Sequence, residues 1–272
     1  MSRPVPALRT RAFALVAVSA TAATVATAAD AQEYNGLTPQ EAVKKMTVSP
    51  GFCMDLIAAE PDIVQPIAFT FDARGRIWVV EGNTYPQRAG NPPPARATDG
   101  GDLSKPSKAR QKDILGGQDR VLIFEDKDGD GTFETRKVFI ENLNLASGIK
   151  LGFGGVYIGA TSYLLHIPDA NGDDARDGPP DILLDGFRWQ DTHETLNSFN
   201  WGPDGWLYDC HGVFTHSNVG APGTPAKART AMNSAYWRFH PVRKTFEIYA
   251  TAPPIRGAST ITKTATGSAR PA

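Results

Sequence analysis

A short phrase recurs three times along this chain, and its repetition constrains the fold more than any other feature. The three copies are Phe71–Val79, Leu151–Ile158 and Trp201–Tyr208. Each copy places a Gly turn between an apolar strand and a second strand rich in aromatic and β-branched residues, which is the pattern of a β-hairpin. Gly155 and Gly205 are 50 residues apart. A period of about 40 to 50 residues built from short strands is typical of a β-propeller.

Two further apolar runs follow each copy of the phrase. They are residues 120–124 and 136–140 after the first copy, 163–167 and 181–184 after the second, and 235–240 and 245–249 after the third. Four strands make one propeller blade, so the sequence predicts an all-β chain with about three blades over residues 61–252. Because a closed ring usually needs about four to eight blades, we expect exposed sheet edges.

The N-terminus has the features of a secretory signal peptide. Residues 1–31 begin with three arginines, continue with an apolar run at Ala12–Val18, and end in small residues at Ala29–Ala31. The sequence therefore predicts export to the periplasm or cell envelope. An uncleaved N-terminal anchor is the alternative.

Charge and cysteine content exclude several classes of partner. The net charge of −1 gives no electrostatic bias toward nucleic acid, so we expect no nucleic-acid partner. Cys53 and Cys210 leave room for one disulfide in an oxidising compartment. Neither cysteine lies in a Cys-x-x-Cys-His motif, so covalent haem attachment is not encoded, and zinc lacks a convincing ligand set.

The segments outside the repeat differ in character. Within residues 32–60, Thr38, Pro39 and Glu41 predict the capped start of a short helix over 38–48 that leads into the repeat. Residues 86–118 are rich in Pro and Gly without periodicity, which predicts a long mobile loop inserted into the first blade. A lid over a binding site is the alternative for that loop.

The C-terminal tail breaks the repeat. A fourth copy of the phrase is due near position 255, yet residues 253–272 contain neither the phrase nor an aromatic residue. We therefore predict that this tail is non-homologous to the rest, as a frameshift or early stop in a truncated gene would produce.

Two of the predicted hairpin turns carry oxygen-bearing side chains at the spacing of a calcium loop. The first turn has Asp126, Asp128, Asp130 and Glu134, and the second has Asp169, Asn171, Asp173 and Asp177. Calcium takes six to eight hard oxygen ligands on a tightly turning backbone. The first turn keeps Gly131 at the sixth position, where the second has Asp174, and Lys137 replaces the final Glu of an EF-hand. Ordinary polar turns at hairpin ends are the alternative.

Histidine and carboxylate residues gather around the third copy of the phrase. His193 lies beside Asp191 and Glu194, and His211 and His216 follow the copy. A histidine with a carboxylate partner can act as a general base near neutral pH. Polar residues at the start of an inner strand would face the axial channel of a propeller, where ligands commonly bind. The alternative is that each histidine caps a strand or bonds to a loop.

These motifs together resemble a known family. The matching segments are Gly51–Pro61, Gly75–Gly82, Asp191–Thr195, Trp201–Tyr208 and His211–Ser217. Over residues 48–250 they resemble the membrane-bound dehydrogenase family that is abundant in planctomycetes. That family is similar to the soluble quinoprotein glucose and sorbosone dehydrogenases, which are six-bladed propellers holding pyrroloquinoline quinone (PQQ) and calcium.

The resemblance implies a function and a role for each candidate residue. His193 would take the proton of a sugar or alcohol hydroxyl as hydride passes to the quinone, and Asp191 or Glu194 would orient it. His211 and His216 would line the cofactor pocket, and a cytochrome would accept the electrons. The alternative function is that of a calcium-stabilised propeller module that binds carbohydrate or protein without catalysis.

Overall fold

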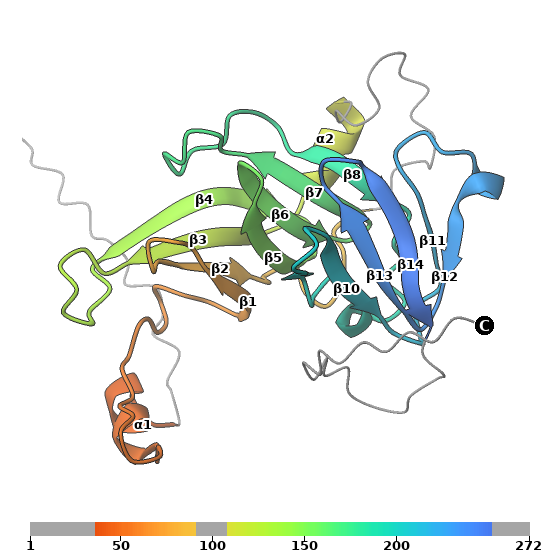
Figure 1. The fold of residues 1–272 in the computed structure, drawn as a ribbon. Helices are drawn as coiled ribbons and strands as arrows, with labels where there is room; N and C mark the ends of the chain where they lie inside the picture. The colour runs from red at the N-terminus through yellow and green to blue at the C-terminus, as the bar shows by residue number, and fades with distance from the viewer. Residues whose placement is uncertain (1–35, 91–107, 252–272) are drawn as a thin grey trace, which may run out of the picture.

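Three four-stranded antiparallel sheets follow one another along the chain in the computed structural model, which describes residues 36–90 and 108–251 (Figure 1). The first sheet has the strand order β1 (Pro66–Phe71), β2 (Ile77–Glu81), β3 (Asp119–Glu125) and β4 (Thr135–Leu143). The second has the order β5 (Ala146–Gly152), β6 (Gly155–Ala160), β7 (Tyr163–Pro168) and β8 (Asp181–Asp185). The third has the order β9 (Asn200–Trp201), β10 (Leu207–His211), β13 (Ala235–His240) and β14 (Thr245–Thr251). The prediction of an all-β chain is therefore confirmed.

The remaining elements are short. A two-stranded sheet, β11 (Ser217–Val219) and β12 (Thr230–Met232), is inserted into the third unit. The helices are α1 (Pro39–Lys45), α2 (Lys108–Ile114) and the 3₁₀ turns η1 (Thr192–Glu194) and η2 (Ala226–Ala228). None of the helices in the described ranges is long and apolar enough to cross a membrane. The predicted signal peptide over 1–31, the predicted tail over 253–272 and residues 91–107 of the predicted insertion lie outside the described residues.

The recurring phrase forms a hairpin in each unit, as predicted. The three copies become β1–β2, β5–β6 and β9–β10, and each pair is antiparallel. Gly75 and Gly205 have φ values of 82° and 77°, in the left-handed region that only glycine adopts without strain. In the first turn the Asp72 carboxylate also accepts hydrogen bonds from the backbone of Arg74 and Arg76, at 2.8 and 3.0 Å. Local turn chemistry thus sets the hairpins.

The second sheet lies between two hydrophobic cores. Because successive residues of a strand face opposite sides, Ile158 packs toward the first sheet and Tyr157 toward the third. The core with the first sheet includes Trp78, Val80, Val121, Ile123, Ile149 and Leu165. The core with the third sheet includes Leu164, Phe187, Leu196, Leu207, Trp237 and Phe239. This face-to-face packing makes the sheets a continuous stack.

The N-terminal segment begins with the predicted capped helix. Thr38 caps α1 and exchanges hydrogen bonds with Glu41, which is a capping box, so that prediction is confirmed. After α1, Ala58 and Ile63 pack against the outer face of the first sheet, on Val79 and Leu122. The lead-in segment thereby covers part of a sheet face that would otherwise be open.

The segment 86–118, which the sequence predicts as a long mobile loop, contains a helix in its C-terminal part. Helix α2 forms there, with Arg110 and Ile114 buried. Ile114 is 1% exposed and joins the core between the first two sheets, while Arg110 lies 3.4 Å from the Asp185 carboxylate. The helix is stabilised by these tertiary contacts, which override a local sequence without clear amphipathic periodicity.

Two glycines of the second sheet let the chain pass close to it on the way to the third. A Cβ atom added at Gly148 or Gly159 would lie 2.1 or 2.3 Å from the Leu196 carbonyl oxygen. Ser147 also donates hydrogen bonds to the carbonyls of Thr195 and Leu196, each at 3.2 Å. These contacts fix the segment that directly follows η1.

Candidate functional site

An open cleft of about 600 Å³ lies between two loop segments. One wall is the segment that follows β2, from Tyr85 to Arg88, and the other is the segment that follows β8, from Trp189 to His193. The cleft therefore joins the end of the first sheet to the connection between the second and third. Clefts of this size are large enough to hold a small molecule such as a sugar.

His193 lies in this cleft between a carboxylate and a phenol. Asp191 caps η1, and its Oδ1 accepts hydrogen bonds from the His193 backbone N–H and from Nδ1, both at 3.0 Å. On the other side of the ring, Nε2 contacts the Tyr85 hydroxyl. Because the carboxylate accepts from Nδ1, the Nε2 lone pair is free to accept the phenolic hydrogen. The His193 side chain is 74% exposed, so a ligand can reach it.

A buried threonine holds the Asp191 backbone in place. Thr215, which is fully buried, accepts a hydrogen bond from Asp191 N and donates one to Asp191 O, each at 3.0 Å. Asn197 donates a hydrogen bond to the His193 carbonyl at 2.6 Å. The pair of Asp191 and His193 is thus anchored to the scaffold even though the imidazole is exposed.

Glu194, the other predicted partner of His193, is directed elsewhere. Its carboxylate accepts a hydrogen bond from Phe214 N at 2.6 Å, and its carbonyl accepts one from Gly212 N at 2.9 Å. A Cβ atom added at Gly212 would lie 2.4 Å from Glu194 Cδ. The Glu194 side chain therefore ties η1 to the loop after β10, and the structure places Asp191 alone of the two beside the imidazole.

The structure does not bring His211 and His216 into the cleft. His211 is 3% exposed, with Nε2 at 2.8 Å from Ser217 Oγ and Nδ1 at 3.0 Å from the Gly212 carbonyl. Burial lowers the pKa of His211, so the neutral ring is favoured. His216 is exposed, and its backbone N–H faces the Gln190 side chain at 3.4 Å.

The first predicted calcium loop gathers its carboxylates. Ligand atoms of Asp126, Asp128, Asp130 and Glu134 all lie within 4.8 Å of one another. Asp126 accepts hydrogen bonds from Gly129 N and Gly131 N, at 2.7 and 2.9 Å. The backbone N–H of Gly131 is the main cause of a lowered pKa for Asp126. This set of hard oxygens on a turning backbone fits calcium.

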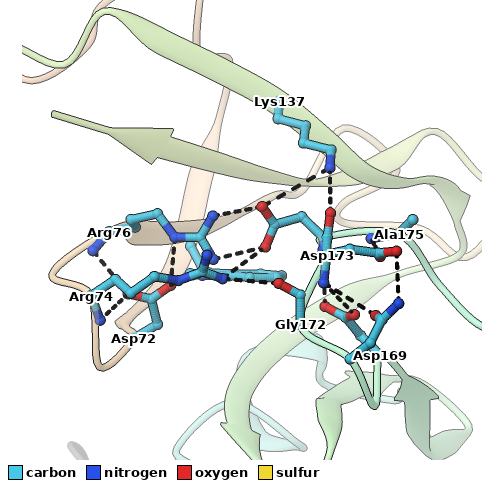
Figure 2. Close-up of polar contacts among 11 residues, drawn as sticks. Asp72, Arg74, Arg76, Lys137, Asp169, Gly172, Asp173 and Ala175 are labelled. Carbon is cyan, nitrogen blue, oxygen red and sulfur yellow. Dashed lines mark hydrogen bonds and ion pairs between the residues drawn. The ribbon is translucent and has the colours of Figure 1, made fainter. Parts of the chain in front are cut away.

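The second predicted calcium loop bonds to basic side chains of the first sheet and its β1–β2 turn. Figure 2 shows Arg74, Arg76 and Lys137 reaching toward the loop that carries Asp169 and Asp173. Asp174, at the position where a calcium loop has glycine, forms a bidentate ion pair with Arg76 at 2.6 and 2.7 Å. The Lys137 ammonium donates to the Asp173 carbonyl at 3.0 Å.

The side chains of the second loop bond mostly within the loop. Asp169 accepts hydrogen bonds from the backbone of Asp173 and Asp174, and Asn171 donates to the Asp173 carboxylate. Asp177 accepts a hydrogen bond from Ala170 N at 2.7 Å. The loop is thus a junction between the first two sheets.

The whole of this site lies within a recognised domain. A family model described as a domain of unknown function, DUF7133, matches residues 38–258. The chain belongs to the DUF7133 family. The match includes both walls of the cleft and both acidic loops. No curated protein matches the chain.

Three cleft residues of this DUF7133 domain were missed by the sequence reasoning. Tyr85, which contacts His193, is 108 positions away from it. Arg88 belongs to the stretch predicted as a solvated insertion, and Trp189 precedes the histidine cluster without a motif of its own. An aromatic residue and an arginine directly after a repeat strand were the only available signals.

The two cysteines of the DUF7133 domain do not form a disulfide. Cys53 is exposed in the lead-in segment, and Cys210 is buried in β10. The disulfide for which the sequence left room is therefore not formed in this structure.

Proposed function

We propose that this DUF7133 domain oxidises a hydroxyl group of a sugar or related alcohol in the cleft, in the manner of the quinoprotein-type dehydrogenases that its motifs resemble. The observation that carries the proposal is the hydrogen-bonded row of Asp191, His193 and Tyr85 in an open cleft. A carboxylate that orients an imidazole, with the second ring nitrogen directed at a hydroxyl, is an arrangement suited to general-base catalysis.

The proton transfer can be followed through these residues. Asp191 holds the Nδ1 hydrogen, so Nε2 of His193 is the basic atom. The Tyr85 hydroxyl now contacts that atom, and a substrate hydroxyl would take its place or bond beside it. The proton of the substrate hydroxyl passes to Nε2. A hydride leaves the carbon that carries this hydroxyl and passes to a two-electron acceptor, so that a carbonyl product forms.

PQQ fits the described lining of the cleft poorly. This quinone carries several carboxylates, and Arg88 is the single lysine or arginine among the lining residues that the structure describes. His211 and His216, which the resemblance assigned to the cofactor, lie outside that lining. The role proposed for His193 does not depend on PQQ. Any two-electron oxidant could accept the hydride.

The proposed function includes an architecture and a location. Three successive four-stranded sheets, packed face to face, support the arrangement of blades in a β-propeller. The basic and apolar N-terminus supports a periplasmic or cell-envelope protein, where a cytochrome would accept the electrons.

Reduction of a dye by the full chain tests the proposal. We expect dye reduction with one or more sugars or polyols, assayed with and without added PQQ and calcium. His193→Ala should lower kcat/KM about 100-fold or more, because the general base is lost. The control is His240→Ala, whose ring lies in β13 and packs on Trp206; it should stay within about twofold. Equal activity of His193→Ala and the unsubstituted chain would contradict the proposal.

A second candidate function is supported by the first acidic loop. Its clustered carboxylates favour a calcium-stabilised module that binds carbohydrate or protein without turnover. In that case His193→Ala would leave ligand binding nearly intact, and no sugar would reduce the dye. The two functions therefore predict different effects of His193→Ala. Both are compatible with calcium in the first loop.

Calcium should raise the melting temperature of the domain if the first loop binds it. A calcium concentration about tenfold above the dissociation constant stabilises by about 1.4 kcal/mol, or about 3–5 °C for a domain of this size. The measurement is thermal unfolding across a calcium series. Asp128→Asn, an exposed substitution, should remove most of the shift, whereas Asp173→Asn in the second loop should keep it. The absence of a shift would exclude a stabilising site.

A further inference from the structure

Arg88 is a buried cation with an unused hydrogen-bond donor at the edge of the cleft. Its side chain is 1% exposed, although the residue lines the cleft. Nε donates to the Thr161 carbonyl at 2.7 Å, and Nη2 contacts the Asp113 carboxylate. Nη1 has no hydrogen-bond partner among the residues that the structure describes. A buried donor without a partner costs free energy, which a ligand with an acceptor oxygen would recover.

Buried hydrogen bonds anchor the backbone after Arg88 and the Asp113 residue that its guanidinium contacts. Asn144, which is 2% exposed, accepts a hydrogen bond from Ala89 N and donates one to Ala89 O, both at 2.9 Å. The same amide donates to the Asp113 carbonyl at 3.0 Å. Asp113 also accepts a hydrogen bond from the Tyr163 hydroxyl at 2.9 Å, so its carboxylate is shared. Arg88 and its partner Asp113 thus lie in a network of buried hydrogen bonds.

Trp189 provides a second element of a binding site. It lines the cleft, and its ring centre lies 5.5 Å from the Arg88 Cζ atom. An aromatic ring offers an apolar surface for the carbon face of a sugar, beside a cation that would hold a charged substituent. His193 lines the other part of the same wall, where it would meet a hydroxyl.

From this arrangement we infer that the cleft takes a carboxylate-bearing sugar or polyol, such as a uronate or an aldonate, with the carboxylate on Arg88 Nη1. The fate of the hydroxyl near His193 rests on the proposed function, but carboxylate binding does not. Nη1 is almost completely shielded from solvent in this conformation. Binding is therefore coupled to a shift of the exposed lining side chains, of which Gln87 is one.

Calorimetric titration of the full chain, without any electron acceptor, tests this inference. Glucuronate should bind about tenfold or more tightly than glucose, because a charge-assisted hydrogen bond is gained. Glucuronamide has nearly the same shape without the charge, and it should lose most of that advantage. Equal affinity for glucuronate, glucuronamide and glucose would overturn the inference. Glucose 6-phosphate binding more tightly than glucuronate would overturn the assignment to a carboxylate.

A substitution locates the carboxylate on Arg88. Arg88→Lys keeps the positive charge, but one ammonium group cannot bond to Thr161, Asp113 and a ligand at the same time. The affinity for glucuronate should therefore fall to within about twofold of the affinity for glucose. The matched control is Arg243→Lys, at an exposed arginine in the turn between β13 and β14, which should keep the full preference. A folded Arg88→Lys variant with an unchanged preference would overturn the inference. If that variant does not fold, the comparison of glucuronate with glucuronamide decides.

The outcomes also separate this inference from the proposed function. Preference for glucuronate without dye reduction by any substrate would support the carboxylate site and reject the dehydrogenase. Dye reduction of neutral sugars that depends on His193, without any preference for acids, would support the dehydrogenase and reject the carboxylate site.

Discussion

Replacing Arg76 with alanine is expected to lower the free energy of unfolding by about 3–5 kcal/mol, the loss typical when one partner of a buried ion pair is removed. The Arg76 side chain is 4% exposed and links two turns. It forms a bidentate pair with Asp174 at 2.6 and 2.7 Å and bonds to Asp72 at 2.7 Å. The variant would leave both carboxylates largely buried without this cation. Urea unfolding at neutral pH measures the loss.

A neighbouring arginine provides the control. Arg74 approaches the same Asp174 carboxylate at 3.3 Å, but its side chain is 56% exposed. Because exposed ion pairs contribute little, Arg74→Ala should cost less than about 1 kcal/mol. Equal losses for the two variants, or a loss below about 1 kcal/mol for Arg76→Ala, would show that burial does not govern this junction.

The contribution of the Arg76–Asp174 pair to stability should decrease as the pH falls. The hydrogen bonds from Arg76 are the main reason why the pKa of Asp174 is lowered in the folded domain. A lowered carboxyl pKa stabilises the fold above the unfolded value of about 4, and that stability is lost as the pH falls through the folded value. The difference between the unsubstituted chain and Asp174→Asn should therefore shrink as the pH falls below about 4.

Asp209→Asn is expected to stabilise the domain at alkaline pH. Asp209 is fully buried in β10; its Oδ1 accepts a hydrogen bond from Ser198 N at 2.9 Å, and its Oδ2 has no hydrogen-bond partner among the described residues. Burial raises the pKa of Asp209 to about 8. A raised carboxyl pKa means that the stability present below about pH 4 is lost as the pH rises to about 8.

The amide of Asp209→Asn keeps the acceptor for Ser198 N and carries no charge at any pH. At pH 8.5 we expect a gain of about 2 kcal/mol, or a melting temperature about 4–8 °C higher. At pH 5 the two proteins should differ by less than about 1 kcal/mol. Thermal unfolding across this range is the measurement, and parallel curves for the two proteins would refute the prediction.

Asp119→Asn is a control that should lower the stability of the domain, whereas Asp209→Asn should raise it. It is also fully buried with a pKa raised mainly by burial, but both of its oxygens accept backbone hydrogen bonds, from Thr84 N at 2.5 Å and Ala146 N at 2.6 Å. In Asp119→Asn one of these N–H groups would face an amide NH₂ and lose its acceptor. This variant should lose stability at every pH tested, because a buried donor is left without a partner.

The hairpins and strands could be predicted because their causes are local. Gly75 and Gly205 occupy the left-handed region that each turn needs, and alternating apolar residues define the strands around them. The sequence also offered Asp191 and Glu194 as partners of His193, because all three residues lie in or beside one short turn, and the structure selects Asp191. The α2 helix could not be predicted from the local sequence, because buried contacts of Arg110 and Ile114 stabilise it.

The candidate site shows the same division. Asp126, Asp128 and Asp130 converge because they lie within one turn. The second loop has similar spacing, yet Arg76, which is 98 positions before Asp174, decides its role as a junction. His211 and His216 carry the residue type expected of a pocket, but the course of β10 and the loop after it keeps them out of the cleft.

By itself, the sequence determined the all-β class, the three repeated hairpins, the acidic turn at Asp126 and the two candidate carboxylate partners of His193, Asp191 and Glu194. These features depend on residues a few positions apart, whose geometry follows from backbone preferences and turn chemistry. The tertiary structure alone decided that Tyr85 meets His193, that the buried Arg88 beside the cleft pairs with Asp113, and that Asp174 pairs with Arg76. Such contacts join residues tens of positions apart, and only the packing of whole sheets against one another fixes them.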